Sequence, residues 1–242
     1  NDSRVSGSAQ YPLGFSPDDK TAYLQVKQSQ GPDAVVAWDI VADKKTEVFR
    51  DDNTDPTPIY VEDKLYGVRV MDGLPRTHFF DPQSAVAKLY RKLEKAFAGQ
   101  RVDITSMTQD GKLALVLVDG DTNPGDFYFF DSTTNKADRL LGRKEWIDPE
   151  RVAEVKPISF KARDGLDIPA FLHTPDKALC GDGPWPAVVH PHGGPWARDD
   201  LAFDYSMWRP LLTSRCRAVL QPQYRGSAGW GRRLWFAGDK EW

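Results

Sequence analysis

Short apolar segments that alternate with polar positions fill the first 150 residues of the chain. Three of them follow polar turns, at Thr21–Val26, 65–70 and 113–118. Three more, at 35–38, 78–80 and 127–130, end in an aromatic residue that precedes aspartate, and apolar pairs follow at 48–49 and 140–141. Alternation with a period of two is typical of half-buried β-strands. The pattern therefore predicts three successive groups of antiparallel strands.

The chain also matches itself at a shift of 92 residues. At this shift Ser-Pro-Asp-Asp-Lys at 16–20 falls on Thr-Gln-Asp-Gly-Lys at 108–112, and Trp38-Asp39 falls on Phe130-Asp131 without a gap. Because 92 is twice 46, we expect a middle copy, which residues 62–81 fit more loosely. Periods of this length with several short strands indicate β-propeller blades, and an unrelated antiparallel sandwich is the alternative. Since a closed propeller takes about four to eight blades, we expect further blades upstream.

A helix near residues 83–98 interrupts the strands. Its apolar positions recur at helical spacing: Val86, Leu89, Tyr90, Leu93 and Phe97. Its basic residues lie off this stripe: Lys88, Arg91, Lys92 and Lys95. Pro82 suits the first turn and Gly99 the C-terminal stop. A basic amphipathic helix can bind a membrane or a partner, but we favour packing on the blades with a solvated basic face.

The pattern changes near Asp148-Pro149. Two segments, at 157–162 and 166–173, flank the hairpin turn signal Arg163-Asp164-Gly165. An apolar strand at 187–190, a short helix at 206–214 and a strand at 218–221 follow, an order that implies a parallel pair. We therefore expect about three blades of a partial β-propeller over residues 1–148 and a different, α/β domain over residues 149–242.

Composition excludes some function classes. The chain has 242 residues, a net charge of −3 and 40% hydrophobic residues, which is ordinary for a soluble globular protein. No excess of basic residues marks nucleic acid as a partner, and no apolar run approaches the roughly 18 residues of a membrane span. We expect no cofactor and no metal, because His190 and His192 lack a carboxylate partner at a recognisable spacing.

Two cysteines, Cys180 and Cys216, give neither a disulfide framework nor the spacing of a metal site. We expect two free thiols. The compartment stays open between the cytoplasm and the periplasm or outside of the cell, and so does the oligomeric state.

Candidate chemistry lies in His192-Gly193-Gly194-Pro195, directly after the apolar strand. Acyl transfer passes through an oxyanion, which needs preorganised donors where the charge develops. Backbone N–H groups on a glycine turn suit this task because glycine reaches positive φ and lets a substrate approach closely. An ordinary turn at the exit of a strand is the alternative.

The surrounding residues resemble the prolyl oligopeptidase family of serine peptidases, and within it the acylaminoacyl-peptidase and dipeptidyl-peptidase-like branch. The resemblance is strong over residues 190–242 and weak over the strand pair from 157. It rests on the segments 192–199, 220–227, 229–231 and 238–242 and on Trp208. It implies blades of a β-propeller followed by the N-terminal part of an α/β-hydrolase domain, which the repeat supports independently.

Site residues follow from this resemblance. It implies an oxyanion-hole amide at Gly194, with Gly193 shaping the approach, and substrate contacts from His192, Trp196 and Tyr224. Gln223 stands where asparagine is usual in the family. Cys216 stands where glycine often ends a helix in the left-handed conformation, at a cost of about 1 kcal/mol if that geometry is kept.

The residues of a catalytic triad are not found in the sequence. Ser227 lies in Gly-Ser-Ala-Gly, but Arg225 occupies the first glycine of the nucleophile motif G-x-S-x-G, so we reject it. The resemblance implies a longer enzyme that cleaves short peptides, of which this chain is an internal fragment that stops before the nucleophile and is inactive alone. A carboxylesterase and a non-catalytic propeller binding module are the alternatives.

Overall fold

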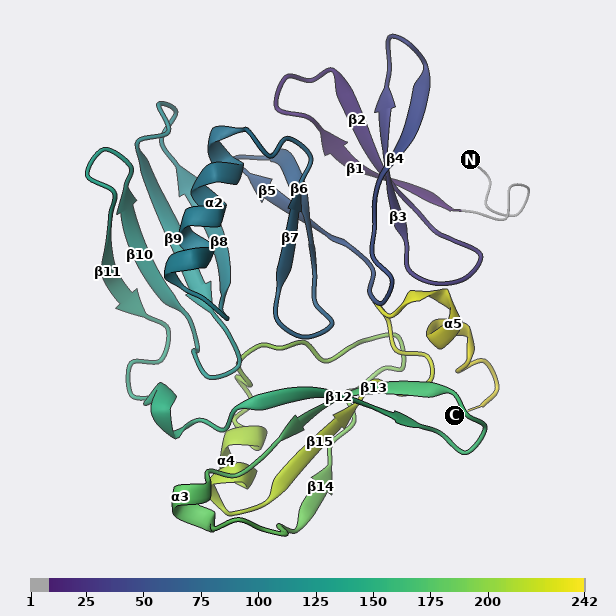
Figure 1. The fold of residues 1–242 in the computed structure, drawn as a ribbon, viewed down its shortest axis with the longest axis vertical. Coiled ribbons are helices and arrows are strands. Elements are labelled where there is room, and N and C mark those ends of the chain that lie inside the picture. Colours follow the sequence, from purple (N-terminus) through teal and green to yellow (C-terminus); the bar gives the residue numbers. More distant parts are fainter. Residues whose placement is uncertain (1–8, 242) are drawn as a thin grey trace.

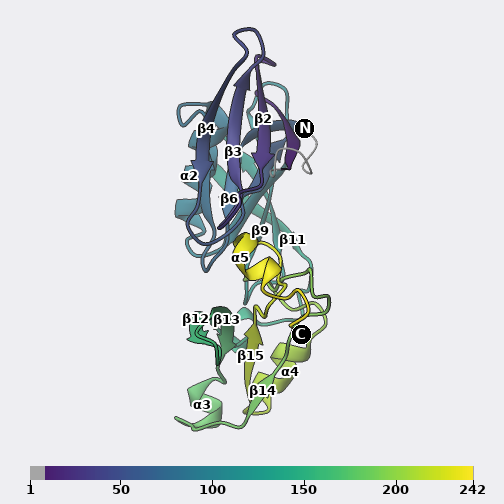
Figure 2. The same ribbon diagram turned by 90° about the vertical axis from the view of Figure 1, so that its right-hand side faces the viewer.

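Residues 9–241 are described by the computed structural model, in which the strands form four β-sheets. Residues 1–8 of the predicted first domain and Trp242, the last residue of the resemblance, lie outside the described part. The first three sheets lie next to one another, and the fourth lies beneath them (Figure 1). Seen from the side, they form an elongated molecule with the fourth sheet at one end (Figure 2).

The three sheets match the three predicted blades. The first holds β1 (Gln10–Phe15), β2 (Thr21–Val26), β3 (Ala34–Asp39) and β4 (Lys44–Arg50), the second β5 (Thr57–Val61), β6 (Lys64–Val70) and β7 (Arg76–Phe79), and the third β8 (Arg101–Met107), β9 (Leu113–Asp119), β10 (Asp126–Asp131) and β11 (Lys136–Gly142). Within each sheet the strands follow one another in chain order and are antiparallel. The predicted partial propeller is confirmed, although its middle sheet has three strands.

The turns show why the chain matches itself at a shift of 92 residues. Asp18 accepts a hydrogen bond of 2.6 Å from the Ser16 hydroxyl, and Asp110 accepts one of 2.7 Å from the Thr108 hydroxyl. At the end of the second strand that follows, Asp39 and Asp131 each accept backbone N–H groups two and three residues further on. Aspartate stabilises such turns by binding its own following backbone. The repeated residues therefore fix equivalent turns of the first and third sheets.

Helix α2 (Ala85–Ala96) packs against the second and third sheets, as the apolar stripe predicts. The Ser84 hydroxyl caps its first turn by accepting the Ala87 N–H, so Pro82 precedes the helix instead of lying in its first turn. Tyr90 is 1% exposed, and its hydroxyl accepts the N–H of Ile104 on β8. The four basic residues of the helix are exposed, as expected for a solvated face.

The fourth sheet has the order β12-β13-β15-β14. Its strands are β12 (Val155–Lys161), β13 (Asp167–His173), β14 (Ala187–Val189) and β15 (Ala218–Pro222), with η1 (Pro149–Arg151), α3 (Lys177–Cys180), α4 (Trp208–Ser214) and α5 (Gly231–Phe236) around them. The hairpin β12–β13 and the parallel pair β14–β15 confirm the predicted elements. The domain boundary near Asp148 stays a prediction, and it falls between the end of β11 and the start of β12.

Helix α5 joins the fourth-sheet region to the first sheet (Figure 1). The Arg232 N–H donates to the Gly31 carbonyl over 2.9 Å. Gly231 has φ +76°, and a Cβ added there would lie 2.6 Å from the carbonyl carbon of Gly31. Only glycine allows this approach of two backbones. Nearby, the Arg198 guanidinium donates to the Met71 carbonyl over 2.5 Å.

The prediction of two free thiols is wrong. Cys180 and Cys216 form a disulfide whose Cα atoms lie 5.4 Å apart. Count and spacing could not reveal this pair, because the fold brings together two positions 36 residues apart. Within residues 9–241, no helix is long and apolar enough to cross a membrane.

Candidate functional site

The His192–Pro195 segment leaves the fourth sheet at the carboxyl end of β14. The His190 N–H donates to the Leu220 carbonyl over 2.8 Å and extends the parallel pairing by one residue. Pro195 is buried, and its carbonyl accepts the Ala197 N–H over 2.7 Å, which closes a tight turn. Ligands of open α/β sheets bind at the carboxyl ends of strands. The turn therefore occupies a position where binding groups are usual.

Two consecutive glycines lie in this turn, and the backbone requires glycine at the second of them, Gly194. Gly194 has φ +144°, and an added Cβ would lie 2.9 Å from the backbone nitrogen of Trp196. Gly193 is exposed, and an added Cβ there would meet nothing within 4 Å. Neither glycine N–H donates a hydrogen bond to another group of the described chain. Two exposed backbone donors are thus available to an anionic ligand.

His192 holds the turn against the segment that follows β15. Its ring stacks on Tyr224 with centroids 4.4 Å apart, and the Tyr224 hydroxyl donates to the His192 carbonyl over 2.8 Å. Burial raises the pKa of Tyr224, which therefore keeps its proton at neutral pH. Of the residues predicted to contact substrate, these two contact each other. Trp196, the residue after the turn, is 61% exposed.

The pair formed by His192 and Ser227 superficially resembles a catalytic dyad. His192 Nε2 lies 2.8 Å from Ser227 Oγ. Ser227, however, is 0% exposed, so a substrate carbonyl cannot reach its oxygen. Its own N–H donates to the Tyr224 carbonyl. Geometry thus supports the rejection of Ser227 as a nucleophile and gives it a positioning role toward the His192 ring.

Asp199 and Gln223 tie the far end of the turn to β15. The Gln223 side chain accepts the Asp199 N–H over 3.2 Å and donates to the Asp199 carbonyl over 2.8 Å. Gln223 is 0% exposed, and the glutamine that replaces the usual asparagine satisfies both backbone groups of Asp199. Burial raises the pKa of the Asp199 carboxyl, and the neighbouring His192 and Arg209 oppose this rise.

Other parts of the described chain do not extend this site. A cavity of about 750 Å³ lies between loops of the first two sheets, the β12–β13 hairpin and α5, and no residue of the 192–195 turn lines it. Within residues 9–241, no group of three or more His, Cys, Asp or Glu side chains is arranged to hold a metal ion.

Two curated proteins resemble the chain in sequence, while no family model matches it. Dipeptidyl aminopeptidase BIII of Pseudoxanthomonas mexicana is 28% identical over 240 residues, which are 96% of this chain and 34% of that protein. Dipeptidyl peptidase family member 6 of Caenorhabditis elegans is 33% identical over 160 residues, 58% of this chain and 21% of that protein. The chain thus spans about a third or less of the length of these relatives.

Solved structures share the fold. Prolyl oligopeptidase B from Galerina marginata matches with a TM-score of 0.62 and 15% identity over 95% of this chain and 32% of its own. The chain is thus similar in sequence to dipeptidyl aminopeptidases and in fold to members of the prolyl oligopeptidase family. Members of this family are serine peptidases, and the predicted resemblance is confirmed.

In this chain the sequence predicted the 192–195 turn, but it did not predict the side chains that support the turn. The predicted residues Gly193, Gly194, His192, Trp196 and Tyr224 lie together around one turn. The sequence did not predict that Asp199 and Ser227 support the turn. Ser227 lies between Gly226 and Gly229, a pattern typical of a turn, but its contact with His192 depends on the fold.

Proposed function

We propose that the intact protein is a serine peptidase that cleaves short peptides, and that the 192–195 turn supplies one half of its oxyanion hole. The observation that carries this proposal is the pair of exposed backbone N–H groups of Gly193 and Gly194, which donate to nothing in the described chain. The tetrahedral intermediate of acyl transfer needs donors of this kind, held in place before the reaction. The Gly194 N–H is the donor, and Gly193 leaves space for the substrate.

His192 and Tyr224 act as positioning residues in this proposal. The stacked His192 ring and the hydrogen bonds to Tyr224 and Ser227 fix the turn from one side. The Asp199–Gln223 pair fixes it from the other side. A donor that is already held in place stabilises developing charge without reorganisation at the moment of reaction. Trp196, on the exposed side, contacts the substrate.

Substitution of the two glycines tests this assignment in the intact enzyme with an aminoacyl p-nitroanilide as substrate. Gly194→Ala forces the turn to shift because the new Cβ would lie 2.9 Å from the Trp196 nitrogen. We expect kcat to fall about 100-fold, as misplacement of a catalytic group by about 1 Å does. Gly193→Ala adds a methyl group in open space, so we expect a higher KM with kcat nearly unchanged.

An unchanged kcat in Gly194→Ala would contradict the oxyanion role. Hydrolysis of p-nitrophenyl esters without hydrolysis of anilides would instead identify a carboxylesterase. If the intact protein hydrolyses neither substrate, the binding-module alternative holds.

A second test uses the 242-residue chain by itself with a fluorophosphonate probe, which labels activated serines. We propose that this chain forms no acyl-enzyme, because Ser227, the one serine among residues 9–241 that is paired with a histidine, is 0% exposed. We expect no stoichiometric labelling by intact-mass spectrometry, in the chain or in its Ser227→Ala variant. Labelling that disappears in Ser227→Ala would show that this serine is a nucleophile.

A further inference from the structure

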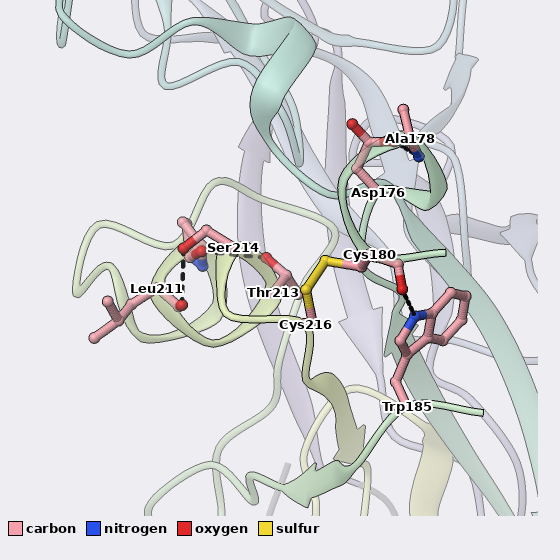
Figure 3. The surroundings of a disulfide bond; sticks show 9 residues. Asp176, Ala178, Cys180, Trp185, Leu211, Thr213, Ser214 and Cys216 are labelled. Atoms are coloured by element: carbon pink, nitrogen blue, oxygen red, sulfur yellow. Dashed lines mark hydrogen bonds between the residues drawn. A yellow bond between two sulfur atoms is a disulfide. The ribbon is translucent and has the colours of Figure 1, made fainter. Parts of the chain in front are cut away.

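The disulfide lies before the start of the parallel strands β14 and β15 (Figure 3). The 192–195 turn follows β14. Cys180 is the last residue of α3, and Cys216 lies between α4 and β15. The indole N–H of Trp185 donates to the Cys180 carbonyl over 3.3 Å and anchors this end of the loop. The 36-residue separation of the two cysteines encloses β14, the 192–195 turn and α4. The bridge therefore closes a loop that contains the whole candidate site turn.

Cys216 occupies a backbone position that favours glycine. Its φ is +57°, directly after the end of α4. The Cys216 N–H donates to the Thr213 carbonyl over 3.0 Å, and the Arg217 N–H donates to the Leu212 carbonyl over 3.1 Å. These two bonds define the Schellman helix end, whose left-handed residue is usually glycine. A cysteine in this backbone conformation is strained, and the disulfide explains why a cysteine occupies the position in place of glycine.

Strand β14 is weakly held by itself. It has three residues, of which Ala187 and Val189 are exposed, and in the described chain it pairs with β15 alone. Its register rests on three Cα pairs, from Ala187 with Ala218 to Val189 with Leu220. A slip by one residue would turn every side chain of such a strand to the other face. A slip would also move the Gly193 and Gly194 amides, which follow directly.

We infer that the Cys180–Cys216 bridge sets the register of β14 against β15 and thereby the position of the 192–195 turn. The protein then needs oxidising surroundings to reach this structure, since glutathione and thioredoxin keep such thiols reduced in the cytosol. The bridge forms by thiol–disulfide exchange, in which the two cysteines give two electrons and two protons to a disulfide oxidant that becomes two thiols. This inference is independent of the proposed function, because the position of the turn is measured without any substrate.

Hydrogen exchange followed by mass spectrometry tests the inference on the 242-residue chain, oxidised and after reduction by a phosphine. We expect no free thiol in the oxidised protein and two after reduction. Reduction should accelerate exchange of the backbone amides at 187–190, which pair with β15, at least tenfold, while those of β9 in the third sheet stay unchanged. Two free thiols after folding with oxidised glutathione, or equal exchange at 187–190 in both states, would overturn the inference.

Two variants separate the bridge from the strain at Cys216. Cys180→Ser removes the bridge and keeps the left-handed cysteine, and we expect the melting temperature to fall by about 10 °C. The double variant Cys180→Ser/Cys216→Gly also removes the bridge but relieves the strain, so it should recover a few degrees. Exchange at 187–190 should nevertheless remain fast in both variants. Slow, wild-type exchange in the double variant would show that the bridge does not set the register.

Discussion

Gly67→Ala is expected to lower the free energy of unfolding by about 3 kcal/mol, the upper range for an overpacked interior. Gly67 lies in the middle of β6, buried between β5 and β7. A Cβ added there would lie 2.2 Å from the His78 carbonyl oxygen and 2.9 Å from the Phe79 Cα. Both neighbours are backbone atoms, which no rotamer change can move aside. The alanine must therefore push β6 and β7 apart and weaken the middle sheet.

Urea unfolding at neutral pH measures this effect, with Gly120→Ala as the matched control. Gly120 is also buried, but its added Cβ would lie no closer than 3.8 Å to any neighbour. We expect the control to change stability by less than about 1 kcal/mol. Equal effects of the two substitutions would show that the contact between β6 and β7 is not the cause.

The free energy of unfolding should also fall by about 2 kcal/mol between pH 7 and pH 5 because of one histidine. His173 is 3% exposed, and burial lowers its pKa to about 4. The charge of Arg209 acts in the same direction, while Gln221, 2.8 Å from the ring, and Asp204 act against it. The unfolded chain binds a proton near its ordinary value of 6.5. Stability is therefore complete above that pH and is lost as the pH falls toward 4.

Urea midpoints at pH 7 and pH 5 test this dependence in the wild type and in His173→Asn. The variant should be less stable at pH 7 but should lose most of the difference between the two pH values. His78→Asn serves as the control, because burial lowers the pKa of His78 as well but this side chain is on the propeller and less enclosed. A full wild-type difference in His173→Asn would assign the pH dependence to other groups.

Local patterns predicted much of the fold. Strands such as β2, β6 and β9 alternate in polarity and follow aspartate-containing turns. The residues that predict each of these strands therefore lie within a few positions of it. The first strand of each blade was missed for local reasons. Pro58 interrupts the pattern of β5, and a bulge between Ile104 and Ser106 breaks the alternation of β8. Helix α5 is short and rich in aromatic and basic residues, and its place depends on contacts with the first sheet.

The candidate site likewise combines features that the local sequence predicts with contacts that only the fold creates. The sequence indicates the backbone conformation at Gly194, because few residues other than glycine reach φ +144°. The pairing of His192 with Ser227 and of Cys180 with Cys216 depends on a sheet that brings distant segments together. Such contacts leave no local periodicity.

Where α5 contacts the first sheet, Gly31 and Gly231 differ in the substitutions that the contact can tolerate. A methyl group added to Gly31 would point into open space, whereas one added to Gly231 would enter the opposite backbone. The spacing of the two parts is thus set by main-chain atoms, which mutations of nearby side chains cannot alter. Side-chain changes around this contact can strengthen or weaken the attachment, whereas a side chain added at Gly231 would push the two parts apart.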